Sequence, residues 1–269
     1  MGHWPQTTAP ILDATEPDGQ ATIICLNWHQ TARPRRLGNG DTKSWVCERG
    51  RTSEPDGKTN QFMASAAANE DLAKRWYERK SALMEASLGK EHDIIMHALI
   101  PYYVGGGLDL YYYPNALPGT AIATKELCEL PDAGPSNKVF SCYELVMFTK
   151  HELDVGAADN ESTAFGRQHS NIKAILNLIA RYSAEAKLNP NETCEFLADM
   201  VGMGGKCVIF DEYACHSDDM AESFGLLAVI EVFQSEMAYA RRRGTTQLIE
   251  RLKSEDYYPY SDLDREPVA

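Results

Sequence analysis

The fold is decided by residues 224–265, FGLLAVIEVFQSEMAYARRRGTTQLIERLKSEDYYPYSDLDR. This segment predicts a strand followed by two helices. Its first part, 225–233, is a nearly unbroken apolar segment of strand length, which predicts a strand covered on both faces. A helix is expected next. Ser235 offers its hydroxyl as the amino-terminal cap, Glu236 places negative charge at the positive end, and Gly244 ends the helix after three arginines.

A second short helix is expected from about residue 245, because three apolar residues recur on one stripe: Leu248, Ile249 and Leu252. The chain then leaves through 257–260, YYPY, into an acidic tail.

Upstream of this run the apolar pattern predicts an antiparallel meander. Four extended segments are separated by short turns rich in glycine and proline: 94–103, 108–113, 121–127 and 140–149. Connections this short favour antiparallel neighbours, because a parallel return needs a longer crossover. Helices are expected after residue 61, around Ile172 to Tyr182 and, as a short one, near 194–200, with a further strand at 207–213. The fold class is therefore α+β, a mixed and largely antiparallel sheet flanked by helices.

The first sixty residues differ from the rest. Two short apolar patches, 21–28 and 44–47, flank a basic, glycine-rich loop that contains the turn pair Asn39 and Gly40, so a small β-hairpin is plausible. Residues 53–61 have the composition of a linker. We therefore divide the chain into an amino-terminal segment, 1–60, and a main domain, 61–269.

The end of the chain, 231–265, resembles the end of bacterial Suppressor of fused-like domains. The resemblance extends to 105–111 (GGGLDLY), 120–124 (TAIAT) and 143–152 (YELVMFTKHE), and covers roughly residues 60 to 269. It implies a mixed α and β fold, whose animal relatives bind and restrain a transcription factor. The bacterial relatives look like immunity proteins against polymorphic toxins.

Composition narrows the class of partner. The formal net charge of −13 disfavours binding to nucleic acid or to an anionic membrane, because both require a positive surface. A basic protein is the better partner. The first ten residues lack an export signal and no apolar run approaches the ~20 residues of a membrane span, so we expect a cytoplasmic protein. The seven cysteines, an odd number, suggest reduced thiols and no disulfide.

Candidate catalytic and metal sites are sparse. Cys25, His29 and Cys47 supply three ligands where a structural zinc ion normally has four, so we expect no metal, and no cofactor motif is present. The alternative of an uncharacterised enzyme rests on His151 with Glu152 and Asp109, and Glu144 within a strand also merits inspection.

The leading hypothesis is a non-catalytic protein-binding domain that masks a partner, such as an immunity protein that neutralises a basic toxin domain. The predicted contact residues are the acidic loop of Asp218, Asp219 and Glu222, and the tyrosines near the Gly105 turn: Tyr103, Tyr111 and Tyr113. A solvated loop and core packing are the plainer interpretations of these two groups. A third possibility is a scaffolding domain whose specificity lies in residues 1–60.

Overall fold

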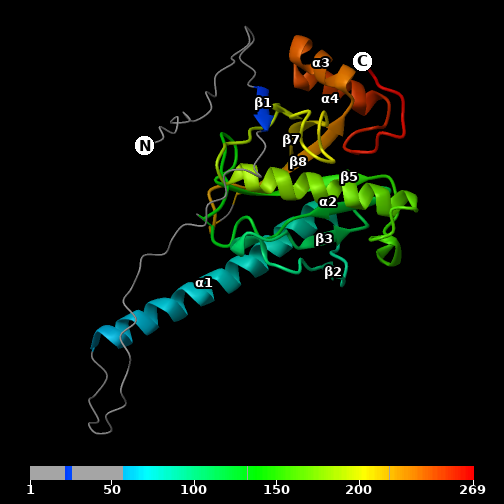
Figure 1. Ribbon diagram of the computed structural model, residues 1–269. Coiled ribbons are helices and arrows are strands. Elements are labelled where there is room, and N and C mark those ends of the chain that lie inside the picture. The colour runs from blue at the N-terminus through cyan, green and yellow to red at the C-terminus, as the bar shows by residue number, and fades with distance from the viewer. Residues whose placement is uncertain (1–21, 26–56, 132, 218) are drawn as a thin grey trace, which may run out of the picture.

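The chain folds into a mixed β-sheet with helices on both faces (Figure 1). The computed structural model describes residues 22–25, 57–131, 133–217 and 219–269. The strands are β1 (Thr22–Cys25), β2 (Ile95–Met96), β3 (Leu110–Tyr113), β4 (Thr120–Ala123), β5 (Cys142–Thr149), β6 (Thr193–Phe196), β7 (Cys207–His216) and β8 (Phe224–Val232). Their order across the sheet is β1-β6-β7-β8-β5-β4-β3-β2. The expected α+β class is confirmed.

Strands β2 to β5 form the expected antiparallel meander. The first predicted strand, 94–103, is much shorter in the structure, because Pro101 cannot donate a ladder hydrogen bond and Tyr102–Val104 forms a turn of 3₁₀ helix. Strand β8 lies in the middle of the sheet, parallel to β5 and antiparallel to β7. All nine residues of β8 are buried, as its apolar sequence predicts.

The short helix expected near 194–200 is wrong. Residues Thr193–Phe196 form β6, which pairs with β7 on one side and with β1 on the other. The side chains of Cys194 and Phe196 are buried against α2 (Ala164–Ser183), so pairing with neighbouring strands overrides the weak local helical signal.

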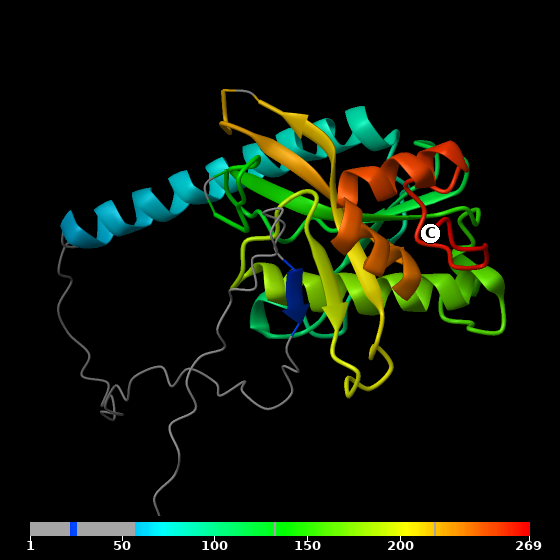
Figure 2. The same cartoon turned by 90° about the horizontal axis from the view of Figure 1, so that it is seen from above.

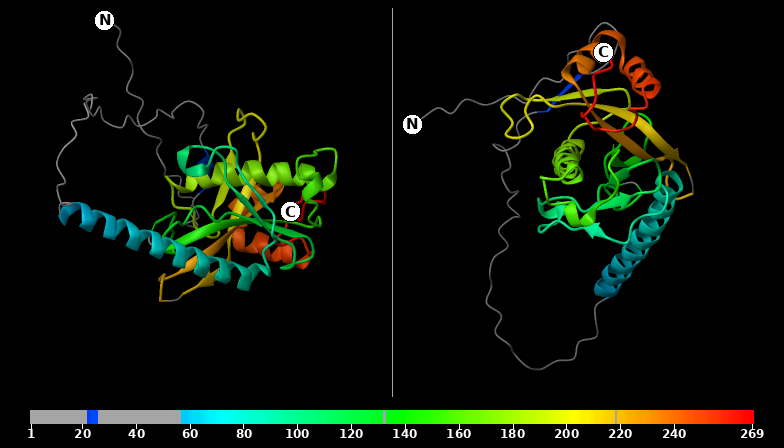
Figure 3. Two further views of the ribbon diagram at one scale, coloured as in Figure 1. Left: turned by 90° about the horizontal axis from the view of Figure 1, so that it is seen from below. Right: turned by 90° about the vertical axis from the view of Figure 1, so that its right-hand side faces the viewer.

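Two apolar layers cover the sheet. Helix α2 packs on one face through the stripe Ile172, Ile175, Leu176 and Ile179. The other face is covered by α1 (Gly57–Leu88), α3 (Gln234–Arg243) and α4 (Thr245–Ser254). The right-hand view of Figure 3 shows α1 and α2 on opposite sides of the strands. The first half of α1 extends away from the sheet (Figure 2).

Helix α3 begins at Gln234, two residues before the start that Ser235 as the cap would give. Phe233 occupies the cap position, and the Glu236 carboxylate accepts the Phe233 backbone N–H at 3.0 Å. The prediction of Ser235 as the cap is therefore wrong, because the carboxylate of Glu236 satisfies the free amide instead. Gly244, at φ 102°, ends α3 as expected.

The carboxy-terminal tail is part of the fold. Tyr260 forms a bridge with Phe148 of β5, and the Ser261 N–H donates to the Phe148 carbonyl at 2.9 Å. Arg265 donates two hydrogen bonds to the buried Glu236 carboxylate, at 2.6 and 2.9 Å. The tail therefore ties α3 to the end of β5.

Part of the amino-terminal segment joins the main sheet. Strand β1 pairs with β6 in parallel, so it is not one half of an isolated hairpin, and α1 begins at Gly57, inside the expected linker. The second apolar patch, 44–47, lies outside the described residues.

Cys194 is disulfide-bonded, so the expectation of reduced cysteines throughout is wrong at this position. Within the described residues, no helix combines the length and apolar character needed to cross a membrane.

Candidate functional site

The strand register brings three loops to one end of the sheet. Phe224, the first residue of β8, pairs with Cys142, the first residue of β5. Tyr111 pairs with Ala123, which pairs with Val146 of β5, so β3 begins and β4 ends at this same end. We call this end, formed by residues 97–109, 124–131, 133–141, 217 and 219–223, the loop end. The predicted contact residues Tyr103, Asp219 and Glu222 all lie in it and are exposed.

Large apolar side chains project from the loop end. In the segment 99–104, which we call the apolar loop, the exposed fractions are 101% for Leu99, 59% for Ile100, 77% for Tyr103 and 62% for Val104. Exposed apolar side chains that stand singly are ordinary on a protein surface. Four of them within six residues form a patch of the kind that marks an interaction site.

Hydrogen bonds to α2 hold the apolar loop in place. The Tyr102 hydroxyl donates to the Ala180 carbonyl at 2.9 Å, and the Arg181 guanidinium donates to the Gly106 carbonyl at 2.9 Å. Gly106 packs so closely that a Cβ there would lie 1.7 Å from the Ile100 carbonyl oxygen. The loop is thus fixed from beneath, and its apolar side chains point away from the fold rather than collapsing onto it.

A cavity of about 390 Å³ lies between α1 and the apolar loop. Its wall contains the aromatic side chains of Trp76, Tyr77, Tyr102, Tyr103 and Tyr111 together with four charged side chains: Lys80, Lys125, Glu126 and Glu129. Trp76 also packs edge-on against Phe224, with ring centroids 5.7 Å apart. Trp76 therefore connects the wall of the cavity to the start of β8.

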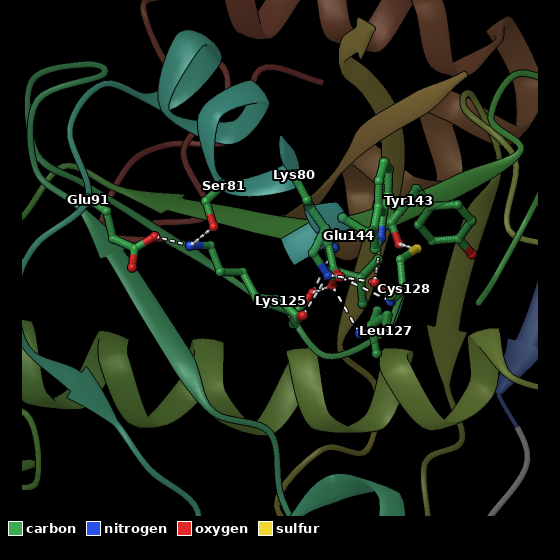
Figure 4. A network of polar contacts seen from close by, with 11 residues as sticks. Lys80, Ser81, Glu91, Lys125, Leu127, Cys128, Tyr143 and Glu144 are labelled. Atoms are coloured by element: carbon green, nitrogen blue, oxygen red, sulfur yellow. Dashed lines mark hydrogen bonds and ion pairs between the residues drawn. The ribbon is translucent and has the colours of Figure 1, made fainter. Parts of the chain in front are cut away.

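A buried ion pair between Lys80 and Glu144 lies beside this cavity (Figure 4). The Lys80 ammonium donates to the carbonyls of Lys125 and Cys128, both at 2.7 Å, and to the Glu144 carboxylate at 2.8 Å. Glu144 in turn accepts hydrogen bonds from Thr124 and from the backbone N–H groups of Leu127 and Cys128. Because every donor of Lys80 is used, this pair fixes α1 to the sheet and is not free for acid–base chemistry.

A second lysine beside the cavity is equally committed. Lys125 donates to the Ser81 hydroxyl at 2.9 Å and forms an ion pair with Glu91. Its ammonium lies 5.2 Å from the centre of the Tyr77 ring and 4.9 Å from that of Tyr111. The aromatic wall of the cavity therefore already stabilises one cation.

Two of the predicted contact tyrosines are in the core. Tyr111 and Tyr113 are 6% and 0% exposed, because β3 is covered on both faces. The Tyr113 hydroxyl donates to Glu91 at 2.7 Å, and burial raises the pKa of both phenols. These residues are therefore not contact residues, and of the three rings only Tyr103 is open to a partner. Asp218 lies outside the described residues.

The alternative catalytic residues do not meet. Asp109 lies at the loop end, where its carboxylate contacts His97 Nδ1 at 2.6 Å. His151 follows β5 at the opposite end and lies 3.6 Å from Asp262. Across β4, the strand register places Tyr111 level with Val146, and His151 follows Val146 by five residues. Because a strand rises about 3.3 Å per residue, Asp109 and His151 are more than ~15 Å apart.

A buried histidine on α2 is also structural. Because a carbonyl can only accept, His169 Nδ1 donates to the Ala158 carbonyl at 3.0 Å, which leaves Nε2 to accept from the Tyr112 hydroxyl at 2.9 Å. Burial lowers the pKa of His169, so the ring is neutral at pH 7.

Metal-ligand candidates are not grouped in the described residues, where no three His, Cys, Asp or Glu side chains lie together in a way that would hold a metal ion. The side chains of Cys25, His29 and Cys47 are outside that part of the structure.

Sequence reasoning missed the Lys80–Glu144 pair and the apolar loop. Glu144 in the middle of a buried strand was a visible signal, because a buried carboxylate requires a partner. Its partner is 64 residues away in sequence, which no local pattern reveals. The apolar loop overlaps the predicted strand 94–103, because its run of apolar residues also fits an extended segment.

Comparison with known proteins finds weak similarity to solved structures. Neither a family model nor a curated protein matches the sequence of this chain. The chain is similar to a chain of the Sufu-Fu complex crystal structure, at 14% identity and a TM-score of 0.49, over 73% of this chain and 92% of that one. It is also similar to a crystal structure of Drosophila Suppressor of fused, at 16% identity and a TM-score of 0.39, over 58% of this chain and 41% of that one. Both are Suppressor of fused structures, and neither concerns an immunity protein.

Proposed function

We propose that the protein binds another protein through its loop end and covers a functional surface of that partner, without catalysing a reaction. The observation that carries the proposal is the apolar loop, whose four large side chains are held in solvent by hydrogen bonds to α2. Keeping apolar surface exposed on a fixed backbone costs stability, and burying it against a partner recovers that free energy.

Charge supports a basic partner. The chain carries a net charge of −13, and the exposed carboxylates Asp219 and Glu222 lie at the same end of the sheet as the apolar loop. Negative charge beside an apolar contact speeds encounter with a basic protein and rejects acidic ones. In its finer form, the proposal is that the partner is a toxin domain, which the chain neutralises by steric occlusion.

The test uses the product of the neighbouring gene, co-expressed with the chain and measured by isothermal titration calorimetry. The double variant Leu99→Ser/Tyr103→Ser removes two exposed apolar side chains without touching the hydrogen bonds that hold the loop. We expect the Kd to rise by roughly thirtyfold, because truncating a central interface residue costs about 2 kcal/mol or more.

Ile94→Ser is the matched control, since Ile94 is also exposed and apolar but lies outside the loop end. This variant is expected to bind as the wild type does. Raising the ionic strength is expected to weaken binding if the acidic side chains contribute. Equal Kd values for the double variant and the control would overturn the assignment of the apolar loop.

A further inference from the structure

The cavity beside the apolar loop has the composition of a cation-binding site. Tyr77, Tyr102 and Tyr103 supply aromatic surface, and Glu126 and Glu129 supply carboxylates at the same wall. Aromatic faces attract cations through the negative charge of the ring face. The volume of about 390 Å³ lies within the about 300–1,000 Å³ of pockets that hold small groups.

The charges of the wall favour a positive occupant. The two lysines that line the cavity are each paired with a carboxylate inside the fold. Two carboxylates remain. Glu126 is half-buried and accepts one hydrogen bond, from the Asp109 N–H at 3.1 Å, while Glu129 is exposed. Burial, together with the neighbouring carboxylates, raises the pKa of Glu126 above its ordinary value. Within the part of the chain that the structure describes, neither Glu126 nor Glu129 forms an ion pair, so these two carboxylates are available to a cation from a partner.

We infer that this cavity receives an arginine side chain of the partner protein, with the guanidinium stacked on the aromatic wall and hydrogen-bonded to Glu126 and Glu129. Arginine fits better than lysine, because its planar guanidinium both stacks on aromatic faces and donates in a fork to carboxylates. This inference rests on the proposed function and names the anchor residue of that interface. An arginine inserted here lies next to the apolar loop, so charge and apolar contact act on one partner segment.

The experiment titrates N-acetyl-L-arginine amide into the full-length protein and follows the indole N–H of Trp76 by NMR. This N–H donates to the Cys128 carbonyl at 2.9 Å at the cavity wall, so its resonance reports on the cavity, and Trp76→Phe identifies the signal. N-acetyl-L-citrulline amide is the matched probe, since it has nearly the same shape without the charge. We expect a saturable shift with arginine and binding at least about tenfold weaker with citrulline.

The double variant Glu126→Gln/Glu129→Gln removes the charge while Gln still accepts from the Asp109 N–H. It is expected to weaken arginine binding by about tenfold without changing the thermal unfolding temperature. The control is Glu152→Gln/Glu250→Gln, which removes the same charge from exposed positions outside the cavity. Absence of a saturable shift with arginine, equal affinity for citrulline, or equal effects of the two double variants would overturn the inference.

The outcomes separate this inference from the proposed function. Partner binding that needs the apolar loop but is unaffected by Glu126→Gln/Glu129→Gln would reject only the arginine site. Arginine binding in the cavity, with partner binding that ignores the apolar loop, would reject the proposed interface and keep the site.

Discussion

Replacing Lys80 with methionine is expected to destabilise the fold by about 3–5 kcal/mol, because removing one partner of a buried ion pair leaves an uncompensated charge. Methionine keeps the length of the side chain but donates no hydrogen bond. The Glu144 carboxylate, 0% exposed, then keeps only the donors from Thr124, Leu127 and Cys128. The loss is therefore electrostatic rather than a packing defect.

Urea unfolding at pH 7 measures this effect, with Lys74→Met as the matched control. Lys74 is exposed on the same helix, so its replacement is expected to change stability by less than about 0.5 kcal/mol. The double variant Lys80→Met/Glu144→Gln removes both charges and is expected to be less unstable than the sum of the single variants. A loss below about 1 kcal/mol for Lys80→Met, or strict additivity in the double variant, would refute the reasoning.

Three further predictions concern the histidine of α2, the apolar loop and the tail. Burial lowers the pKa of His169 below its ordinary value of 6.5. As the pH falls, the unfolded chain therefore takes up a proton at this position before the folded protein does, and the free energy of unfolding decreases below about pH 6.5. His169→Gln is expected to flatten this part of the curve of stability against pH. Gly106→Ala places a Cβ 1.7 Å from a carbonyl oxygen and is expected to lower the midpoint of thermal unfolding, whereas Gly107→Ala, with its nearest contacts at 3.4 Å, is tolerated. Arg265→Ala is expected to cost about 3 kcal/mol in urea unfolding because it leaves the buried carboxylate of α3 unpaired, and a cost no larger than that of Glu266→Ala would contradict this.

The central elements of the fold follow from local sequence. The apolar run of β8 and the meander β2 to β5 were predictable, because buried strands need continuous apolar residues and short turns force antiparallel neighbours. Strand β6 was not predictable in this way. Its four residues become a strand only because β1 and β7 pair with them, and pairing partners are not a local property.

The candidate site was predictable only in part. The glycine-rich turn and Tyr103 directed attention to the loop end, but alternation along a strand cannot show that both faces of β3 are covered, which is why Tyr111 and Tyr113 were misplaced. The cavity joins α1, the apolar loop and the segment after β4, which are far apart in sequence. Such a site follows from tertiary packing and has no motif of its own.

Hydrogen–deuterium exchange on the complex with the neighbouring gene product tests the central claim most directly, because it maps the contact on the unmodified chain. The account predicts that amides of residues 99–107 and 219–223 become protected on binding, while those after β5, around His151, do not change. Protection confined to other surfaces, with the apolar loop exchanging as in the free protein, would contradict it.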